Sequence, residues 1–373
     1  MIALSLAAAL SMAGPSAPVV IGPRVAEAGH VSYVFRAHER GVPARRMRFR
    51  CGLDTPRLRL CPSPYGVTLA PGVHTLRVRA VDPQSRVGPV TVVRVQVLEP
   101  RAPEVRVGAA PLNAIAIGDT VWTENYGDGT ISAVDARSRR VRTIHVGGQP
   151  GGIAYGAGSL WVSDLGDGTL ARVDPESNVV ARIPLGGQPA GVAFADGTVF
   201  VADYAGGLTR VDGSSNRVLG RTPLPGHPEA VAVGFGRVWV TNQDGTITTI
   251  APGTGATDGS RLVVADDVDD VFVAADAVWA VSLYGKTLVR IDPAAKRITA
   301  RHATSGEAAG VLAAAGSIWV SNYDRGTVSR VDPIRLTVVK TYRVGDEPRG
   351  LVEAAGSIWV ANQQSNSVSQ ITP

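Results

Sequence analysis

The sequence contains no apolar run long enough to cross a membrane as a helix. Its most apolar stretch, MIALSLAAALSMAGPSAP at the N-terminus, falls short of the roughly 18 residues that a helical span requires. A transmembrane anchor is therefore not expected. An apolar stretch followed by small residues is instead typical of a secretory signal, although the positive n-region is missing. We expect residues 1–20 to be a signal peptide and the protein to be secreted or to lie in the cell envelope.

Cysteine and lysine are both scarce. The only cysteines among 373 residues are Cys51 and Cys61, and there are only three lysines, so arginine supplies most of the positive charge. Two cysteines are too few for a cysteine-based metal centre, and in an exported protein they predict one disulfide. The arginines are uneven in distribution: residues 21–100 hold thirteen of them against five acidic residues. Few aromatic residues lie among these arginines, which argues against a nucleic-acid surface.

Sequence motifs of common enzymes are also missing. The patterns G-x-S-x-G, H-E-x-x-H and G-x-x-x-x-G-K-[ST] do not occur, and neither cysteine is expected to be free. What the chain has in quantity is glycine (43 residues) and proline (25), with 45% hydrophobic residues. This composition is typical of a turn-rich, globular all-β protein, and the length favours two domains or a repeat array with an extra module.

Alternating apolar and polar residues predict strands near residues 47–51, 58–61, 74–82 and 91–99. On the first of these, Met47, Phe49 and Cys51 share one face, while the arginines between them share the other. The pattern predicts a small antiparallel sandwich over residues 21–100, with one sheet face lined by arginine. Such a face suits an anionic cell-envelope polymer, and an ordinary solvated face is the alternative.

Residues 49–82, FRCGLDTPRLRLCPSPYGVTLAPGVHTLRVRAVD, resemble the immunoglobulin-like modules of bacterial exported proteins. Those modules combine a C-x-L-D hairpin, a Cys-Ser-Pro turn and a G-x-H-x-x-x-V-R-A-x-D strand. The resemblance implies an Ig-like β-sandwich that acts as a spacer or adhesion unit. It implies no chemistry.

From residue 104 to residue 373 one motif of about forty residues recurs, which is typical of β-propeller blades. The units begin near residues 112, 151, 190, 229, 269, 309 and 349. One large aromatic residue recurs in each unit, and we interpret it as packing between blades: Trp122, Trp161, Phe200, Trp239, Trp279, Trp319 and Trp359.

The last unit, 349–373, has three strands where the others have four. The segment EVRVGAAP at 104–111 matches the end of a unit, as in TYRVGDEP at 341–348. We expect it to complete the last blade and close a seven-bladed ring, since closure removes exposed sheet edges. The motifs VWVTN, IWVSN and IWVAN resemble the YVTN and NHL-like propellers of bacteria, a likeness that is specific for fold and weak for function.

The turns that precede each unit differ from one another, and specificity resides where repeats differ. Six polar residues stand before the turn proline or at the equivalent position: Gln149, Gln188, His227, Asp267, Glu307 and Glu347. One side of the mouth of the central channel, which the first strand of each blade lines, would be acidic because of Asp266, Asp267, Asp269 and Asp270 with Glu307, Asp346 and Glu347. The cluster suits Ca²⁺ or Mg²⁺ or a cationic ligand, and a solvated rim is the alternative.

His227 and Glu229 form the one neighbouring pair of histidine and carboxylate in these turns, which makes them candidates for acid–base catalysis. The propeller also resembles virginiamycin B lyase, whose family is described as using histidine, glutamate and Mg²⁺. Its Pro-His-Gly pattern is absent here, since the residues after the turn proline are Gly151, Ala190, Glu229 and Arg349, with Leu112 in the first unit. No catalytic residue is transferred from that resemblance.

These observations favour a monomeric, exported, non-catalytic propeller that binds a protein, a glycan or a small molecule, or acts as a scaffold. A lyase-like or other metal-assisted enzyme is the alternative. The candidate ligand-binding residues are His227, Glu229, Asp266, Asp267, Asp269, Asp270, Glu307 and Glu347.

Overall fold

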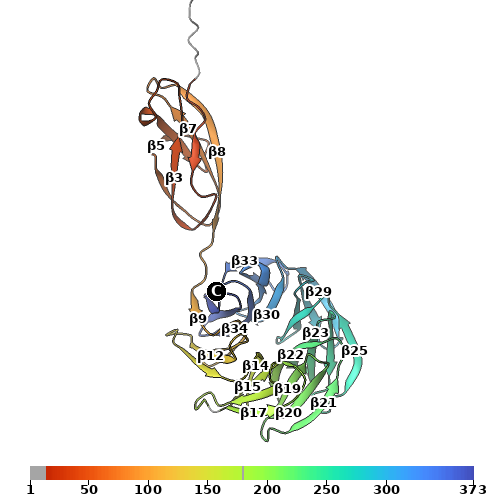
Figure 1. Cartoon of the computed structure of the whole chain (residues 1–373). Coiled ribbons are helices and arrows are strands. Elements are labelled where there is room, and N and C mark those ends of the chain that lie inside the picture. The colour runs from red at the N-terminus through yellow and green to blue at the C-terminus, as the bar shows by residue number, and fades with distance from the viewer. Residues whose placement is uncertain (1–13, 179) are drawn as a thin grey trace, which may run out of the picture. The chain divides into compact units, whose positions relative to one another are not determined.

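The computed structural model describes residues 14–178 and 180–373, in two compact units that divide between Pro100 and Arg101 (Figure 1). The first thirteen residues of the expected signal peptide lie outside the described residues. The described part of that segment does not match the predicted boundary at residue 21, because the first strand begins at Val19 and pairs with Arg36. No helix in the described part of the chain is long and apolar enough to span a membrane.

The N-terminal unit consists of two sheets around one core. The smaller sheet has the order β1 (Val19–Ile21), β3 (Gly29–Arg36), β6 (Tyr65–Leu69). The larger sheet has the order β2 (Val25–Glu27), β8 (Val87–Leu98), β7 (Gly72–Val81), β4 (Arg48–Leu53), β5 (Arg59–Cys61), and a short 3-10 helix spans Ala44–Arg46. The core joins residues of both sheets, such as Tyr33 and Leu69 with Leu76 and Val95.

The predicted disulfide is present and links Cys51 to Cys61, which joins β4 to β5. The predicted alternation also holds, since Met47, Phe49 and Cys51 are buried while Arg48 and Arg50 are exposed. This sheet therefore has one face in the core and one face in solvent.

The described residues of the C-terminal unit form seven antiparallel sheets of four strands, which follow one another around a circle in Figure 1. We call the first strand of each sheet its inner strand. These inner strands are β10 (Pro111–Ile117), β14 (Pro150–Gly156), β18 (Pro189–Ala195), β22 (Pro228–Gly234), β26 (Val268–Val273), β30 (Ala308–Ala314) and β34 (Pro348–Ala354). Each inner strand contacts the next one, and β34 contacts β10.

The second and third strands complete the middle of each sheet. The second strands are β11 (Thr120–Asn125), β15 (Ser159–Asp164), β19 (Thr198–Asp203), β23 (Arg237–Asn242), β27 (Val278–Ser282), β31 (Ser317–Asn322) and β35 (Ser357–Asn362). The third strands are β12 (Thr130–Asp135), β16 (Thr169–Val173), β20 (Gly207–Asp212), β24 (Thr246–Ile250), β28 (Thr287–Asp292), β32 (Thr327–Val331) and β36 (Ser367–Ile371). A 3-10 turn at Tyr323–Arg325 follows β31.

The fourth strands are the outermost and the most exposed. They are β13 (Val141–His145), β17 (Val180–Pro184), β21 (Val218–Pro223), β25 (Thr257–Val263), β29 (Arg297–Ala303), β33 (Val338–Arg343) and, in the last sheet, β9 (Glu104–Arg106). Strand β9 pairs antiparallel with β36, with Val105 opposite Val368. The segment expected to complete the last unit therefore does so.

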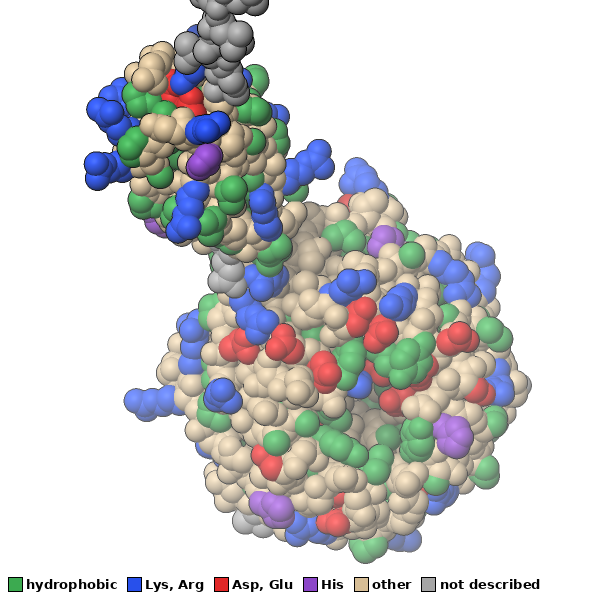
Figure 2. Space-filling model, turned by 45° about the horizontal axis from the view of Figure 1, so that its top comes forward, with side chains coloured by type: hydrophobic (Ala, Val, Ile, Leu, Met, Phe, Trp, Pro, Cys, Tyr) green, Lys and Arg blue, Asp and Glu red, His purple; other side chains and the backbone are tan. Residues whose placement is uncertain are grey.

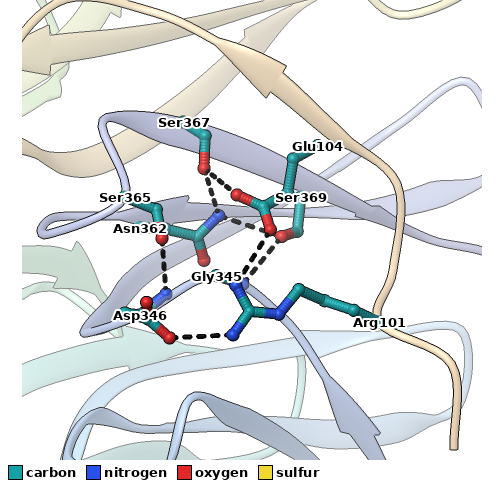
Figure 3. A network of polar contacts seen from close by, with 8 residues as sticks. All are labelled: Arg101, Glu104, Gly345, Asp346, Asn362, Ser365, Ser367 and Ser369. Atoms are coloured by element: carbon teal, nitrogen blue, oxygen red, sulfur yellow. Dashed lines mark hydrogen bonds and ion pairs between the residues drawn. The ribbon is translucent and has the colours of Figure 1, made fainter. Parts of the chain in front are cut away.

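Side-chain contacts reinforce this junction (Figure 3). Arg101 forms ion pairs with Glu104 at 3.4 Å and with Asp346 at 2.9 Å, and Ser367 donates a hydrogen bond to Glu104 at 2.5 Å. Asn362 donates to Ser367 at 3.1 Å and to Ser369. The network joins the first residues of this unit to its last sheet.

The repeated aromatic residues are buried between neighbouring sheets, as the sequence predicts. The six tryptophans are at most 2% exposed, and Phe200, which stands in their place in one sheet, is 1% exposed. Trp161, Trp239 and Trp319 each donate an indole N–H to a backbone carbonyl five residues earlier. These residues hold the scaffold together and leave ligand contacts to other positions.

The residues that end the second strands serve the scaffold too. Asn125, Asn322 and Asn362 are fully buried and donate their amide N–H groups to Thr and Ser hydroxyls of the third strand in the same sheet. Asp164 and Asp203 accept backbone N–H groups from the preceding turn. These polar side chains therefore form hydrogen bonds within the scaffold.

Candidate functional site

Each inner strand begins with a β-bulge. Pro150 pairs with Asp164 and the register shifts before Gly152, and a register shift recurs at the start of the other six inner strands. The second residue is unpaired in all seven strands, and in β10, β18, β22 and β34 the third residue is unpaired as well. A bulge removes one residue from the ladder and redirects its side chain. The residue affected is the second of each strand, and we call these seven positions the mouth ring: Leu112, Gly151, Ala190, Glu229, Asp269, Ala309 and Arg349.

All seven mouth-ring residues line one cavity of about 370 Å³. Its remaining walls include residues that directly follow second strands, namely Tyr126, Leu165, Tyr204 and Gln363. Figure 2 shows one face of the C-terminal unit, where acidic and hydrophobic side chains gather near a hollow. A cavity of this size, with a few polar groups among apolar and aromatic walls, is typical of a small-molecule site.

Four of the mouth-ring residues are small or apolar, and the other three form a charged group. Arg349 Nη1 lies 3.3 Å from the carboxylate of Asp269, 80 positions earlier in the chain. Arg349 Nε donates to Gln363 Oε1 at 2.7 Å, and its guanidinium stacks over the ring of Tyr323 at 5.0 Å. The Arg349 and Asp269 side chains are only 23% and 7% exposed. Water therefore screens this ion pair less than a surface pair.

Glu229 is the most perturbed acid of the site. Burial raises the pKa of its carboxyl group well above the usual range, and the carboxylates of Asp269 and Asp267 raise it further, against a smaller opposing effect of Arg349. Gln243 hydrogen-bonds to it and in turn accepts the Tyr204 hydroxyl at 2.5 Å. The second carboxyl oxygen, Oε2, is buried and has no hydrogen-bond partner. Glu229 therefore holds a proton at neutral pH and has one unused acceptor.

Asp270 lies one residue deeper than the mouth ring and lines the adjoining apolar part of the channel. Its carboxylate accepts the backbone N–H of Val271 at 2.8 Å and of Val311, on the next sheet, at 3.0 Å. Burial raises its pKa to about 7. Four other sheets have glycine here, and at Gly191 and Gly310 an added Cβ would meet backbone of the next inner strand at 2.4 Å. The Asp270 carboxylate thus connects two neighbouring sheets. In the sheets with glycine at this position, the backbones of neighbouring inner strands approach each other directly.

The other predicted residues do not converge on the cavity. His227 is exposed, its Nδ1 lies 3.0 Å from the carbonyl oxygen of Tyr204, and no hydrogen bond in the described part of the chain joins it to Glu229. Lys286 lies 3.7 Å from Glu307, and Glu347 hydrogen-bonds to Tyr323. The backbone carbonyl of Asp266 accepts the hydroxyl of Ser282. The predicted acid–base pair of His227 and Glu229 is therefore not assembled.

Asp267 differs from these residues, because it acts electrostatically on two acids of the site. It is near enough to raise the pKa values of Glu229 and Asp269, its own pKa is raised by burial, and its buried Oδ1 has no hydrogen-bond partner. Even so, the described residues contain no group of three or more His, Cys, Asp or Glu side chains placed to hold a metal ion. The proposed Ca²⁺ or Mg²⁺ site thus lacks a ligand set, because one acid pairs with arginine and another bonds to backbone.

Sequence reasoning missed Arg349, Tyr204 and Gln363 as members of the site. It looked for specificity in the residue before the turn proline and checked the residue after it only for histidine, whereas the bulge brings that second residue into the channel. Aligning the repeats at that second position places the two acids and the arginine in one column with glycine and alanine. The contrast between charged and small residues at this one repeat position is the sequence signal that identifies Arg349 as a member of the site.

Glu124 is an acid near the channel to which the sequence analysis gave no role. It lies on β11, fully buried, and its Oε1 accepts the backbone N–H of Asn113 at 3.0 Å and the side-chain amide at 2.7 Å. Burial raises its pKa to about 7. Asn113 lines both parts of the channel, so Glu124 supports the channel wall from behind.

Comparison with known proteins identifies the fold but leaves the family open. The sequence model of the family described as outer membrane protein assembly factor BamB matches residues 127–258, about a third of the chain. No curated protein sequence matches at a significant level.

Several solved structures are similar in fold. Hydrazine synthase of Kuenenia stuttgartiensis is 16% identical, with a TM-score of 0.63 over 71% of this chain and 96% of its own. The Cps50 (Swd1) β-propeller domain of Myceliophteria thermophila is 11% identical, with a TM-score of 0.62 over 74% and 99%. The WD40 β-propeller domain of Doa1 is 14% identical, with a TM-score of 0.61 over 72% and 95%. These likenesses, with the four-stranded sheets, show that the chain contains a β-propeller.

Proposed function

We propose that the C-terminal unit is a binding module whose channel mouth takes a small ligand with an ammonium group. The observation behind this proposal is an excess of carboxyl groups over cationic groups around the cavity, which raises the pKa of Glu229. The carboxyl groups of Glu229, Asp267 and Asp269 act on one another there, and among the described residues Arg349 is the only cation that lines the cavity. A ligand cation beside Glu229 would balance them.

The cavity also offers the geometry that an ammonium ion uses. Glu229 Oε2 is a buried acceptor without a partner, and a charged donor gains most from such an acceptor. Tyr204 and Tyr126 line the same cavity, and aromatic faces attract cations. The apolar Leu112 and Leu165 suit the hydrocarbon part of the ligand.

Binding should be coupled to proton release. Glu229 is protonated in the free protein at neutral pH because its pKa is raised, and a bound ammonium ion favours the ionised form. Isothermal titration calorimetry with n-butylammonium at pH 7, in two buffers of different ionisation enthalpy, measures the protons released. We expect release from the natural protein and none from Glu229→Gln, whose affinity falls about tenfold or more.

n-Butanol and Glu307→Gln are the controls. n-Butanol has a similar hydrocarbon part without charge, and Glu307 is a turn acid outside the described lining of the cavity. Equal binding of n-butanol and n-butylammonium, or unchanged binding and proton release in Glu229→Gln, would contradict the proposal.

We also propose the wider setting of this module. The seven sheets are interpreted as seven blades that β9 closes, which the β9–β36 pairing supports. The N-terminal unit is interpreted as an Ig-like sandwich, supported by its two sheets and shared core. The Cys51–Cys61 disulfide is compatible with a place outside the cytoplasm, as is the partial match to a family described as an outer-membrane assembly factor.

A further inference from the structure

One face of the larger N-terminal sheet carries five arginines. Alternate residues of β4, β7 and β8, such as Phe49, Val78 and Val93, are buried in the core. The residues between them point away from it. We call this outward surface the arginine face: Arg48, Arg50, Leu60, Arg77, Arg79, Val90, Val92 and Arg94.

Strand register places like charges against each other. Arg50 lies directly opposite Arg79, and these two are flanked by Leu60 on β5 and Val90 on β8. In the next row Arg77 lies opposite Val92. Like charges on directly opposed residues destabilise a sheet. The face therefore costs stability in the isolated protein.

In the described part of the chain these arginines form no ion pair with an acidic side chain. Arg79 Nε is buried without a hydrogen-bond partner. The acids of this unit have other partners. Asp82 and Glu39 both bind Arg86, and Asp54 binds His74 at 2.7 Å, although Arg77 is near enough to lower the pKa of Asp54.

Apolar side chains stand between the arginines and are open to solvent. Leu60, Val92 and Val90 are 67%, 55% and 38% exposed. Figure 2 shows basic and hydrophobic side chains interspersed over the N-terminal unit, with few acidic ones. An anionic polysaccharide would use only the charges of such a face. A membrane surface would use both, because guanidinium groups bind phosphates while apolar side chains enter the boundary below the headgroups.

We propose that the arginine face docks on an anionic phospholipid membrane. Each arginine near such a surface strengthens binding by about fivefold at moderate salt. The contact relieves the repulsion between Arg50 and Arg79, because lipid phosphates supply the negative charge that the sheet lacks.

Vesicle co-sedimentation with the full chain tests this inference. We expect binding to vesicles that mix phosphatidylcholine with phosphatidylglycerol, and little binding to phosphatidylcholine alone. In about 1 M NaCl, where the Debye length is about 3 Å, most binding should disappear. The double variant Arg50→Gln with Arg79→Gln should reduce the partition coefficient about 25-fold.

A matched control separates this face from net charge. The pair Arg217→Gln with Arg335→Gln removes the same charge from exposed positions of the C-terminal unit and should leave vesicle binding unchanged. Val90→Thr with Val92→Thr should weaken the binding that remains at high salt. Both valines stay β-branched in that variant, so the sheet is preserved.

A thermal melt of the N-terminal unit within the full chain guards against a trivial loss of fold. Because the repulsion is removed, the Arg50→Gln, Arg79→Gln variant should melt no lower than the natural protein. A lower melting temperature would show a structural role and overturn the inference. Equal binding to both vesicle types would also overturn it, as would capture by soluble polygalacturonate without binding to vesicles.

Discussion

Four arginines of the C-terminal unit, Arg142, Arg172, Arg290 and Arg330, lie over the rings of buried tryptophans at 4.8 to 6.0 Å. On the arginine face of the N-terminal unit, five exposed or half-buried arginines form no ion pair in the described part of the chain. The same residue type therefore stabilises one unit and burdens the other. The stacked arginines of the C-terminal unit have partners within the fold, and the proposed membrane contact would supply the partners that the arginine face lacks.

Repeat position explains the first group. Arg172, Arg290 and Arg330 occupy the same place on the third strand, directly opposite the tryptophan of the second strand. In the first sheet that place is taken by Ala133, and Arg142 reaches Trp122 from the fourth strand instead. Four of the six tryptophans thus have an arginine over the ring, whereas Trp239 and Trp359 lie opposite Thr249 and Gln370. The arginine contact indicates a role in the scaffold in those four sheets.

Removing Arg349 should have the largest effect on stability. Arg349→Met keeps much of the apolar stem but leaves Asp269 buried without its cation beside Glu229, and loss of one partner from a buried pair costs about 3 to 5 kcal/mol. Urea unfolding of the C-terminal unit measures the change. Asp269→Asn in the same chain should recover part of it. A loss below about 1 kcal/mol would place this pair among ordinary surface ion pairs.

Buried acids should make stability fall as pH rises. The pKa of Glu124 is about 7 in the folded protein, against an ordinary value near 4.5 when unfolded. The folded state therefore binds more protons at Glu124 between these values, and the contribution of this group to stability is fully present below pH 4.5 and is lost as pH rises through 7. The loss from this group is up to about 3 kcal/mol. Unfolding curves from pH 5 to pH 8 should be flatter for Glu124→Gln, and parallel curves would contradict the prediction.

Breaking one arginine–tryptophan contact should cost less. Arg172→Met removes the contact with Trp161 and the hydrogen bonds to Ser159 and Asn216, a loss of about 1 to 2 kcal/mol. Thermal unfolding of this variant should be compared with Arg217→Gln, which is exposed and should change little. If both variants unfold alike, the stacked arginines do not stabilise the scaffold.

The smallest effect has the opposite sign. Arg79→Gln alone removes a like-charge pair on the arginine face and should raise the melting temperature of the N-terminal unit by about 1 to 4 °C at low salt. Added salt screens the repulsion, so the difference from the natural protein should shrink. Scanning calorimetry at two salt concentrations checks both points.

The repeats made most of the C-terminal unit predictable. The period of about forty residues set the start of each inner strand to within one residue, and the incomplete last unit indicated that β9 pairs with β36. In the N-terminal unit the strands near Met47, Leu76 and Val93 were predicted from alternation. Strand β3 was not among the predicted strands, although Val31, Tyr33 and Phe35 show the same alternation and are buried. Patterns that depend on one strand or one period are visible in sequence.

The candidate site was only partly predictable, for a physical reason. Glu229 and Asp269 were recognised because they are acids in variable turns. Their relation to Arg349 depends on a bulge in each of three separate strands, and on contacts between residues far apart in the chain. No local pattern states which of two neighbouring positions a bulge directs into the channel. The acids proposed to bind Ca²⁺ or Mg²⁺ are also held by contacts that the local sequence does not reveal. Asp269 pairs with Arg349, and Asp270 bonds to the backbone of two sheets.

The pairing of β9 with β36 also determines when the protein can finish folding. Ser367 and Glu104, which meet in this sheet, are separated by 263 positions in the chain. A ribosome therefore releases β9 long before its partner exists, and this sheet can form only after β36 has emerged. Until then β9 is a strand without its partner, and its free edge can pair with another chain. The step that completes the structure is thus also the step at which a nascent chain is most exposed to misassembly.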